Sequence, residues 1–189
     1  FADLDACLHW HPSDRNDVWN GESKAAVSAK FTFAGVTAHA SGSPEKGRSA
    51  LDGVELMNIG ANYMREHLKG DARVHYVVTD GGGAPNVVPA KASVWYYVRA
   101  DDHADVERNF AWLRDIADGA AKMSRTQVSV QIDTDCHEII PNDPLAGLLT
   151  ANLERIAPPK FTAEEQTFAR RLQAPVTEQF GTVFKTAID

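Results

Sequence analysis

The chain has 189 residues, 26 acidic and 19 basic side chains, and a formal net charge of −7. Hydrophobic residues make up 43% of it, an ordinary globular composition that argues against wholesale disorder. The acidic balance opposes attraction to phosphate, so nucleic-acid binding is the weakest hypothesis, although Trp95, Tyr96 and Tyr97 could stack on bases. The sequence contains no apolar run of about 18 residues, so no membrane-spanning helix is predicted. Two cysteines, Cys7 and Cys136, argue against a disulfide scaffold and favour the reducing cytoplasm.

Residues 25–33 alternate between apolar and other side chains, which predicts a strand with one buried face. Next comes a predicted helix with Ser43 as its N-cap and Pro44 in its first turn. Its apolar positions step by three and four residues and are Ala50, Val54, Met57, Ala61, Met64 and Leu68. Gly70 is the expected stop.

Two further strands, a second helix and a fourth strand are predicted between residues 74 and 132. The second helix has an apolar stripe of Val106, Phe110, Leu113, Ala117 and Ala120. On the strand that ends near Arg99, the side chains of Trp95, Tyr97 and Arg99 share one face because side chains alternate along a strand. The order strand, helix, strand, strand, helix, strand over residues 22–140 predicts an α+β fold. We expect a ferredoxin-like βαββαβ sandwich, with a four-stranded antiparallel sheet and two helices on one face.

The flanking segments, residues 1–21 and 141–189, do not continue the strand and helix pattern of the centre. The later one is predicted to be helical, and Thr162 and Glu165 have capping-box spacing. Neither flank has an obvious sheet partner of its own. The sequence therefore predicts three segments: an inserted domain at 22–140, and stubs of its host domain at 1–21 and 141–189.

Near the N-terminus, Cys7, His9 and His11 lie close to Asp5 and Asp14. Imidazoles two residues apart on an extended segment point to the same side and could reach one metal ion, but a closed site needs three or four ligands. The alternative is a polar strand end with surface histidines.

Three other side chains are candidates for binding or catalysis. His39 lies in a loop of small residues and could approach a ligand, or it is an exposed or helix-capping histidine. Asn86 follows a glycine run that fits a flexible hairpin connection better than a phosphate loop, and its amide could donate to a substrate. Arg99 could pair bidentately with a carboxylate or form a surface ion pair. The motifs GxSxG, HExxH and CxxC are absent.

Taken together, these segments resemble a known family. The run FTFAGVTAHASGSPEKGRSALDGVELM resembles the start of the lid, or dimerisation, domain of zinc-dependent amidohydrolases and metallopeptidases. This family includes aminoacylases, carboxypeptidase G and aminobenzoyl-glutamate hydrolases. GGGAPNVVPAKASVWYYVRAD resembles its later lid motif, and LHWHP and TAEEQTFARRLQ are most similar to the aminobenzoyl-glutamate hydrolase branch. The resemblance covers roughly residues 1–175.

The resemblance implies an α/β catalytic domain with two divalent metal ions, zinc or manganese, and an inserted lid that forms a homodimer. It implies that His39 reaches the partner's active site and stabilises an oxyanion, and that Asn86 and Arg99 hold the carboxylate of an N-acyl amino acid, with aminobenzoyl-glutamate as the leading candidate. It also implies that His9 or His11 is a metal ligand. The remaining ligands and the general base would lie outside residues 1–189, so we expect the isolated chain to be inactive and to bind no metal tightly. The alternative is a non-catalytic ferredoxin-like module that dimerises and binds small molecules.

Overall fold

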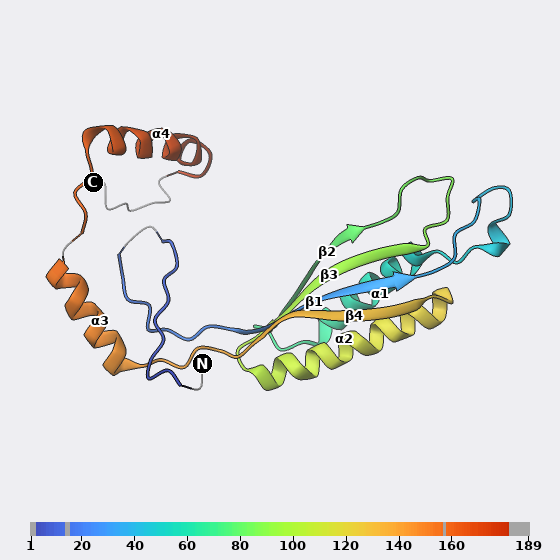
Figure 1. Ribbon diagram of the computed structural model, residues 1–189, viewed down its shortest axis with the longest axis horizontal. Coiled ribbons are helices and arrows are strands. Elements are labelled where there is room, and N and C mark those ends of the chain that lie inside the picture. Colours follow the sequence, from blue (N-terminus) through green and yellow to red (C-terminus); the bar gives the residue numbers. More distant parts are fainter. Residues whose placement is uncertain (1–2, 14–15, 157, 182–189) are drawn as a thin grey trace. The chain divides into compact units, whose positions relative to one another are not determined.

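The computed structural model describes residues 3–13, 16–156 and 158–181. The chain divides into two compact units (Figure 1). The central unit is Gly21–Ile140, and the flanking unit combines Phe1–Asn20 with Pro141–Asp189. Within the described residues, no helix has both the length and the apolar character needed to cross a membrane. Cys7 and Cys136 are exposed free thiols, and a cytoplasmic location remains a prediction.

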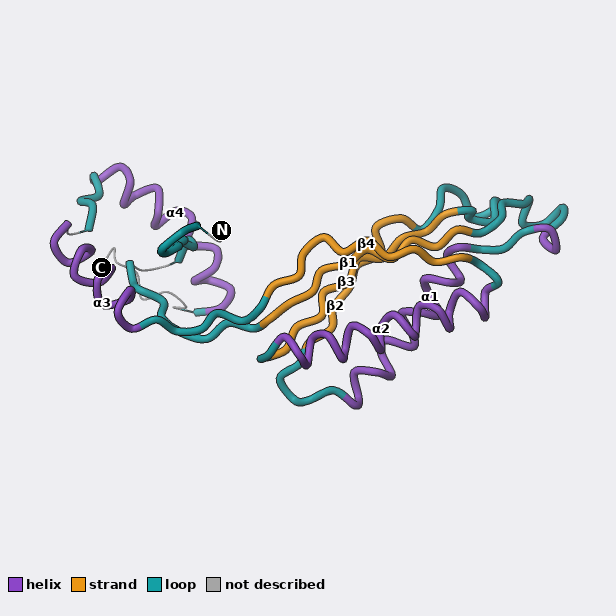
Figure 2. Tube along the Cα trace, turned by 60° about the horizontal axis from the view of Figure 1, so that its bottom comes forward, coloured by secondary structure: helices purple, strands orange, loops and turns teal. Residues whose placement is uncertain are grey.

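A four-stranded antiparallel sheet with two helices on one face forms the central unit (Figure 2). The strands are β1 Ala25–Ala34, β2 Arg73–Asp80, β3 Lys91–Ala100 and β4 Gln127–Cys136, and the helices are α1 Ala50–Met64 and α2 His103–Ser124. The strand order is β2-β3-β1-β4, so β1 pairs with both β3 and β4. The predicted ferredoxin-like α+β sandwich is confirmed.

The two ends of this sheet have different surroundings. We call one end the base: β1 begins there at Ala25 and β3 ends there at Ala100. The opposite end, where β1 ends at Ala34 and β3 begins at Lys91, is the tip. Because β1 follows Gly21 and β4 runs toward Ile140, the chain enters and leaves the central unit at the base.

The alternating side chains of β1 produce the core. Phe31 and Phe33 are fully buried against the helices. The ring of Phe31 meets that of Tyr96 edge to face at 5.7 Å, and the Tyr96 hydroxyl donates a hydrogen bond of 2.6 Å to the Asn58 side-chain oxygen. The predicted stripes of both helices are buried as well, from Ala50 to Met64 on α1 and from Val106 to Ala120 on α2.

The start of α1 differs from the prediction. The N-cap is Ser49, whose Oγ accepts a 3.2 Å hydrogen bond from the Asp52 N–H. Ser43 instead precedes a single 3₁₀ turn, η1 Pro44–Lys46, and makes no side-chain cap. The prediction was wrong because Arg48 is drawn into a bridge with Val36, with N–H to carbonyl distances of 2.8 Å in both directions. After Met64, α1 gives way to a second 3₁₀ turn, η2 Arg65–His67, rather than continuing to Gly70.

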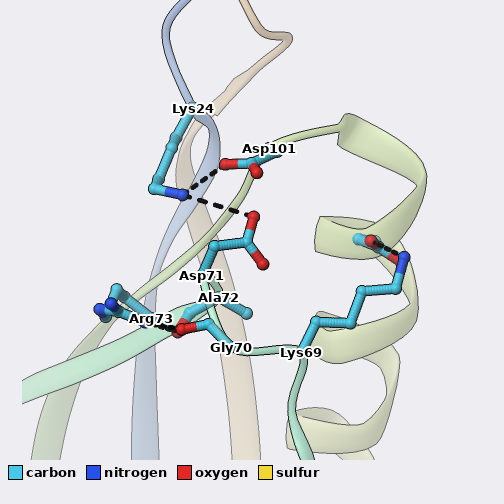
Figure 3. A network of polar contacts seen from close by, with 8 residues as sticks. Lys24, Lys69, Gly70, Asp71, Ala72, Arg73 and Asp101 are labelled. Atoms are coloured by element: carbon cyan, nitrogen blue, oxygen red, sulfur yellow. Dashed lines mark hydrogen bonds and ion pairs between the residues drawn. The ribbon is translucent and has the colours of Figure 1, made fainter.

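A network of ion pairs lies at the base of the sheet (Figure 3). The Lys24 ammonium lies 3.6 Å from an Asp71 carboxylate oxygen and also pairs with Asp101. Hydrogen bonding with Asp71, and then with Lys24, holds the pKa of Asp101 below its ordinary value. Lys69 pairs with Asp105 of α2 at 2.5 Å. These contacts tie the entry of β1 to the start of β2 and the end of β3.

The flanking unit contains α3 Asp143–Ile156 and α4 Ala163–Phe180. The predicted capping box is present: the Thr162 hydroxyl accepts from the Glu165 N–H, and the Glu165 carboxylate accepts from the Thr162 N–H at 2.7 Å. These hydrogen bonds lower the pKa of Glu165. No residue of α3 is buried.

Candidate functional site

Two loops pair at the tip and bring two predicted site residues together. His39, in the loop after β1, forms an antiparallel bridge with Val87, in the loop between β2 and β3. The Ala40 N–H donates to the Asn86 carbonyl at 3.0 Å, and the Val88 N–H donates to the Ala38 carbonyl at 2.9 Å. His39 and Asn86 are therefore held close by main-chain hydrogen bonds on both sides of the pair.

Glycines allow these loops to pack closely. A Cβ on Gly35 would lie 2.0 Å from the Arg48 carbonyl oxygen, and one on Gly47 would lie 3.0 Å from the Val88 methyl groups. Gly82 has a φ of 99°, a conformation that side chains disfavour. In the glycine run that follows β2, Gly82 is therefore the position where the backbone of the hairpin connection favours glycine.

The His39 side chain is exposed, and its ring closes a local turn. Its Nδ1 accepts hydrogen bonds from the N–H groups of Gly42 at 3.0 Å and Ser41 at 3.3 Å. The Ser43 N–H donates to the His39 carbonyl at 3.1 Å, which closes the same turn. Only Nε2 is left to meet another molecule.

Asn86 is exposed on the neighbouring loop. Its main-chain carbonyl is engaged by Ala40. The side-chain amide has no hydrogen-bond partner among the residues that the structure describes. Such an amide is available as both donor and acceptor.

Arg99 lies at the base, on the sheet face that the helices do not cover. It is paired in register with Ala26 of β1 and Arg73 of β2, and its guanidinium lies 5.2 Å from the centre of the Tyr97 ring. The side chain is exposed, and within the described part of the chain it has no carboxylate partner. The surface ion pair considered as the alternative is thus not formed with any described residue, and the guanidinium can bind an anion.

Basic side chains lie near Arg99, and the sequence alone did not reveal this. Arg73 lies directly opposite it on β2, and the Arg73 guanidinium donates to the main-chain carbonyls of Gly70 and Ala72, each at 2.7 Å. His75 follows on the same face, and its pKa is lowered mainly by partial burial, then by Arg99, Arg65 and Arg73. Alternation along residues 73–75 could have shown that Arg73 and His75 share a face, but only the register places them beside Arg99.

The structure therefore separates the predicted carboxylate-binding residues. Asn86 lies at the tip, before β3 begins at Lys91, whereas Arg99 lies at the base, one residue before β3 ends. Eight residue steps of about 3.3 Å each place roughly 26 Å between Lys91 and Arg99. Within one chain, His39 and Asn86 form one group and Arg99 forms another.

The two N-terminal histidines are both exposed. His11 Nδ1 makes a 2.8 Å hydrogen bond with the Pro12 carbonyl. Among the described residues, no three His, Cys, Asp or Glu side chains are arranged to hold a metal ion. His9 and His11 could thus supply only part of a metal site, and Asp14 lies outside the described residues.

Comparisons with known proteins identify a matching domain family and similar enzymes. The family model described as "Peptidase dimerisation domain" matches residues 21–124. A p-aminobenzoyl-glutamate hydrolase subunit of Escherichia coli (strain K12) is 41% identical over 178 residues, which cover 94% of this chain and 37% of that protein. The Xaa-Arg dipeptidase of Mus musculus is 27% identical over 158 residues, or 82% of this chain and 36% of that protein.

A solved structure gives the same result. The aminobenzoyl-glutamate utilization protein from Klebsiella pneumoniae aligns with a TM-score of 0.60 and 26% identity, over 71% of this chain and 34% of that one. The chain thus spans little more than a third of the length of these relatives. The resemblance to the dimerisation domain of amidohydrolases and metallopeptidases is confirmed, and the match over more than half its length shows that the chain belongs to the peptidase dimerisation domain family.

Proposed function

We propose that this chain is the lid portion of a metal-dependent amidohydrolase that cleaves the amide bond of an N-acyl amino acid, with aminobenzoyl-glutamate as the leading substrate. The lids of two copies exchange catalytic groups: His39 and Asn86 of one copy complete a site that contains Arg99 of the other. The 41% identity to a p-aminobenzoyl-glutamate hydrolase supports the substrate class.

The observation that carries this proposal is the separation of the candidate residues along β3. An N-acyl amino acid has about the length of three extended residues, or roughly 10 Å, and cannot bridge the roughly 26 Å from tip to base. All three side chains are nevertheless exposed and lack acidic partners among the described residues. A partner copy whose sheet runs antiparallel to this one would bring its tip to this chain's base. One substrate could then contact His39 and Asn86 of one copy and Arg99 of the other.

The edge of the sheet supports such a pairing. β4 is ten residues long and pairs only with β1, so its outer edge is unpaired within the described part of the chain. Val130 and Ile132 point to the helix face of the sheet but are 37% and 52% exposed. A long edge with exposed apolar side chains is a template for another strand. Two β4 strands paired antiparallel about a two-fold axis would place tip beside base.

Each side chain has a definite role in this site. The Arg99 guanidinium binds the substrate carboxylate bidentately, and the neighbouring Arg73 adds positive charge at the base. The His39 Nε2–H donates to the oxygen that becomes negative as the amide carbonyl is attacked. Asn86, held beside His39, donates its amide to the same substrate.

The family implies two divalent metal ions, which supply the attacking hydroxide when bound. The described residues do not form such a site, so His9 or His11 contributes at most one ligand among several from elsewhere in the longer protein. We therefore expect the isolated 189-residue chain to be inactive.

A complementation experiment on a full-length enzyme that contains this chain tests the proposal. His39→Ala should lower kcat by about 10²–10³ with normal metal content, and Arg99→Ala should mainly raise KM. His67→Ala, which removes an exposed histidine of the central unit, is the matched control and should leave kcat unchanged.

Mixing the two impaired variants, assayed at substrate concentrations well below KM, then distinguishes exchange from isolated sites. A heterodimer of His39→Ala and Arg99→Ala has one site with both residues intact, so random reassociation should restore roughly a quarter of wild-type activity. No recovery from a mixture shown to contain heterodimers would contradict the exchange. Unchanged kcat/KM in both variants would favour a non-catalytic module, and a second, different polypeptide in the purified enzyme would replace the homodimer by a heteromer.

A further inference from the structure

The two ring nitrogens of His39 have different surroundings. Nδ1 faces two main-chain N–H groups, those of Gly42 at 3.0 Å and Ser41 at 3.3 Å. A main-chain N–H can only donate, so Nδ1 must keep its lone pair and act as the acceptor. The proton of the neutral ring is therefore on Nε2.

The backbone that supplies these donors is itself fixed. The Ser43 N–H donates to the His39 carbonyl at 3.1 Å, which closes the turn from His39 to Ser43. From the other side, the Ala40 N–H is bonded to the Asn86 carbonyl at 3.0 Å. The two donors at positions 41 and 42 thus keep their direction without any contribution from their own side chains.

Gly42 is also close to the imidazole. A Cβ at this position would lie 3.4 Å from Nδ1, at the short limit of ordinary contact. Alanine would therefore fit and retain the N–H, whereas proline would remove the shorter of the two hydrogen bonds. This difference gives a matched pair of variants at a single position.

We infer that Ser41 and Gly42 are positioning residues, whose main-chain N–H groups hold His39 in the neutral Nε2–H tautomer and aim that N–H out of the tip. This inference rests on the proposed function for its catalytic meaning. A donor already in the correct tautomer needs no proton rearrangement when the oxyanion forms.

Nuclear magnetic resonance of the 189-residue chain tests the tautomer directly. Long-range ¹H–¹⁵N spectra of ¹⁵N-histidine-labelled protein are recorded near pH 8.5, well above the ordinary histidine pKa of about 6.5. His39→Gln assigns the signal among the seven histidines. We expect a single Nε2–H tautomer with the Nδ1 resonance displaced by its hydrogen bonds, while His67 shows the average of an exposed ring.

The variants at position 42 then test whether the main-chain N–H groups cause the preference for the Nε2–H tautomer. Gly42→Ala should retain the wild-type His39 spectrum, and Gly42→Pro should shift it toward that of His67. If Gly42→Pro disturbs the amide signals of Val87 and Val88, Ser41→Pro provides the second variant, with a smaller shift because its hydrogen bond is longer. An averaged His39 signal in the wild-type chain, or an unchanged tautomer in both proline variants, would overturn the inference.

Kinetics of the full-length enzyme distinguish positioning from general damage. Gly42→Pro should lower kcat about 10- to 100-fold with little change in KM, because the ring is misaligned rather than lost. In the His39→Ala background the same substitution should have no further effect, since it acts only through the ring. An additive loss would overturn the inference. A fixed tautomer together with unchanged kcat in His39→Ala would instead reject the proposed function and leave the hydrogen-bond assignment intact.

Discussion

The central and flanking units follow the same local rules but differ in burial. Both contain helices with well-formed N-caps: the Asp102 carboxylate accepts from the Asp105 N–H at 2.7 Å at the start of α2, and Thr162 caps α4. Yet every buried apolar side chain described lies between Ala25 and Ala121. In the flanking unit, Phe168 is 61% exposed.

This contrast shows that capping and periodicity produce a helix, whereas a core requires a facing surface. The helices of the central unit pack on a sheet made by the same segment. The apolar faces of α3 and α4 have no such partner among the described residues. Under the proposed function, the rest of the catalytic domain supplies that partner.

The strongest test of this contrast removes a phenylalanine from each unit. Phe31→Ala leaves a cavity beside Tyr96 and Phe110 and should cost about 3–5 kcal/mol of unfolding free energy. Phe168→Ala removes an exposed ring and should change it by less than about 0.5 kcal/mol. Urea unfolding followed by tryptophan fluorescence measures both, and equal losses would show that the flanking unit has a core as well.

Alanine substitutions at two helical glycines should change stability in opposite directions, by smaller amounts. A Cβ on Gly53 of α1 would lie 2.4 Å from the Phe33 ring, so Gly53→Ala should destabilise by about 1–3 kcal/mol. Gly147 of α3 has no atom within 4 Å of that position, and Gly147→Ala should stabilise the helix by about 0.5–1 kcal/mol. Circular dichroism at 222 nm during thermal unfolding would detect the lower melting temperature of the first variant and the greater helix content of the second. A loss of helix in Gly147→Ala would mean that a surface packs on α3.

The N-caps test whether local rules act equally in both units. Asp102→Ala should lower the unfolding free energy of the central unit by about 1 kcal/mol, because α2 is part of its core. Thr162→Ala should instead reduce the helix content of α4 and leave the main unfolding transition in place. Hydrogen exchange of the amides at 105 and 165 measures each local effect. Cooperative loss of the central unit in Thr162→Ala would contradict independent units.

The smallest expected effect is a pH dependence at the base. The His103 ring donates to Asp135 at 2.6 Å, and this hydrogen bond, with nearby Glu107 and Glu138, raises the pKa of His103 above 6.5. The resulting stabilisation is fully present below pH 6.5, where the folded and unfolded states are both protonated, and is lost as pH rises through the folded pKa. The stability advantage of wild type over His103→Gln should therefore shrink across that range. A constant difference in urea midpoints from pH 6 to pH 8 would reject the coupling.

Much of the central unit could be predicted from local patterns. Alternation in residues 25–33 and the three-and-four spacing on the helices correctly identified the core faces, because burial on one side of a strand or helix leaves a period in the sequence. The start of α1 could not be predicted this way. Ser43-Pro44-Glu45 is a good local N-terminus, but the bridge between Val36 and Arg48 depends on a contact that no short-range rule contains.

The same division applies to the candidate site. The sequence by itself identified His39, Asn86 and Arg99 as candidate site residues, through their residue types, small neighbours and a family resemblance. Only the tertiary structure decided that His39 and Asn86 meet at the tip while Arg99 lies at the base among Arg73 and His75, because strand register and loop pairing fix which distant segments become neighbours. The physical reason is that main-chain hydrogen bonds between strands carry no signature in residue type, whereas burial does.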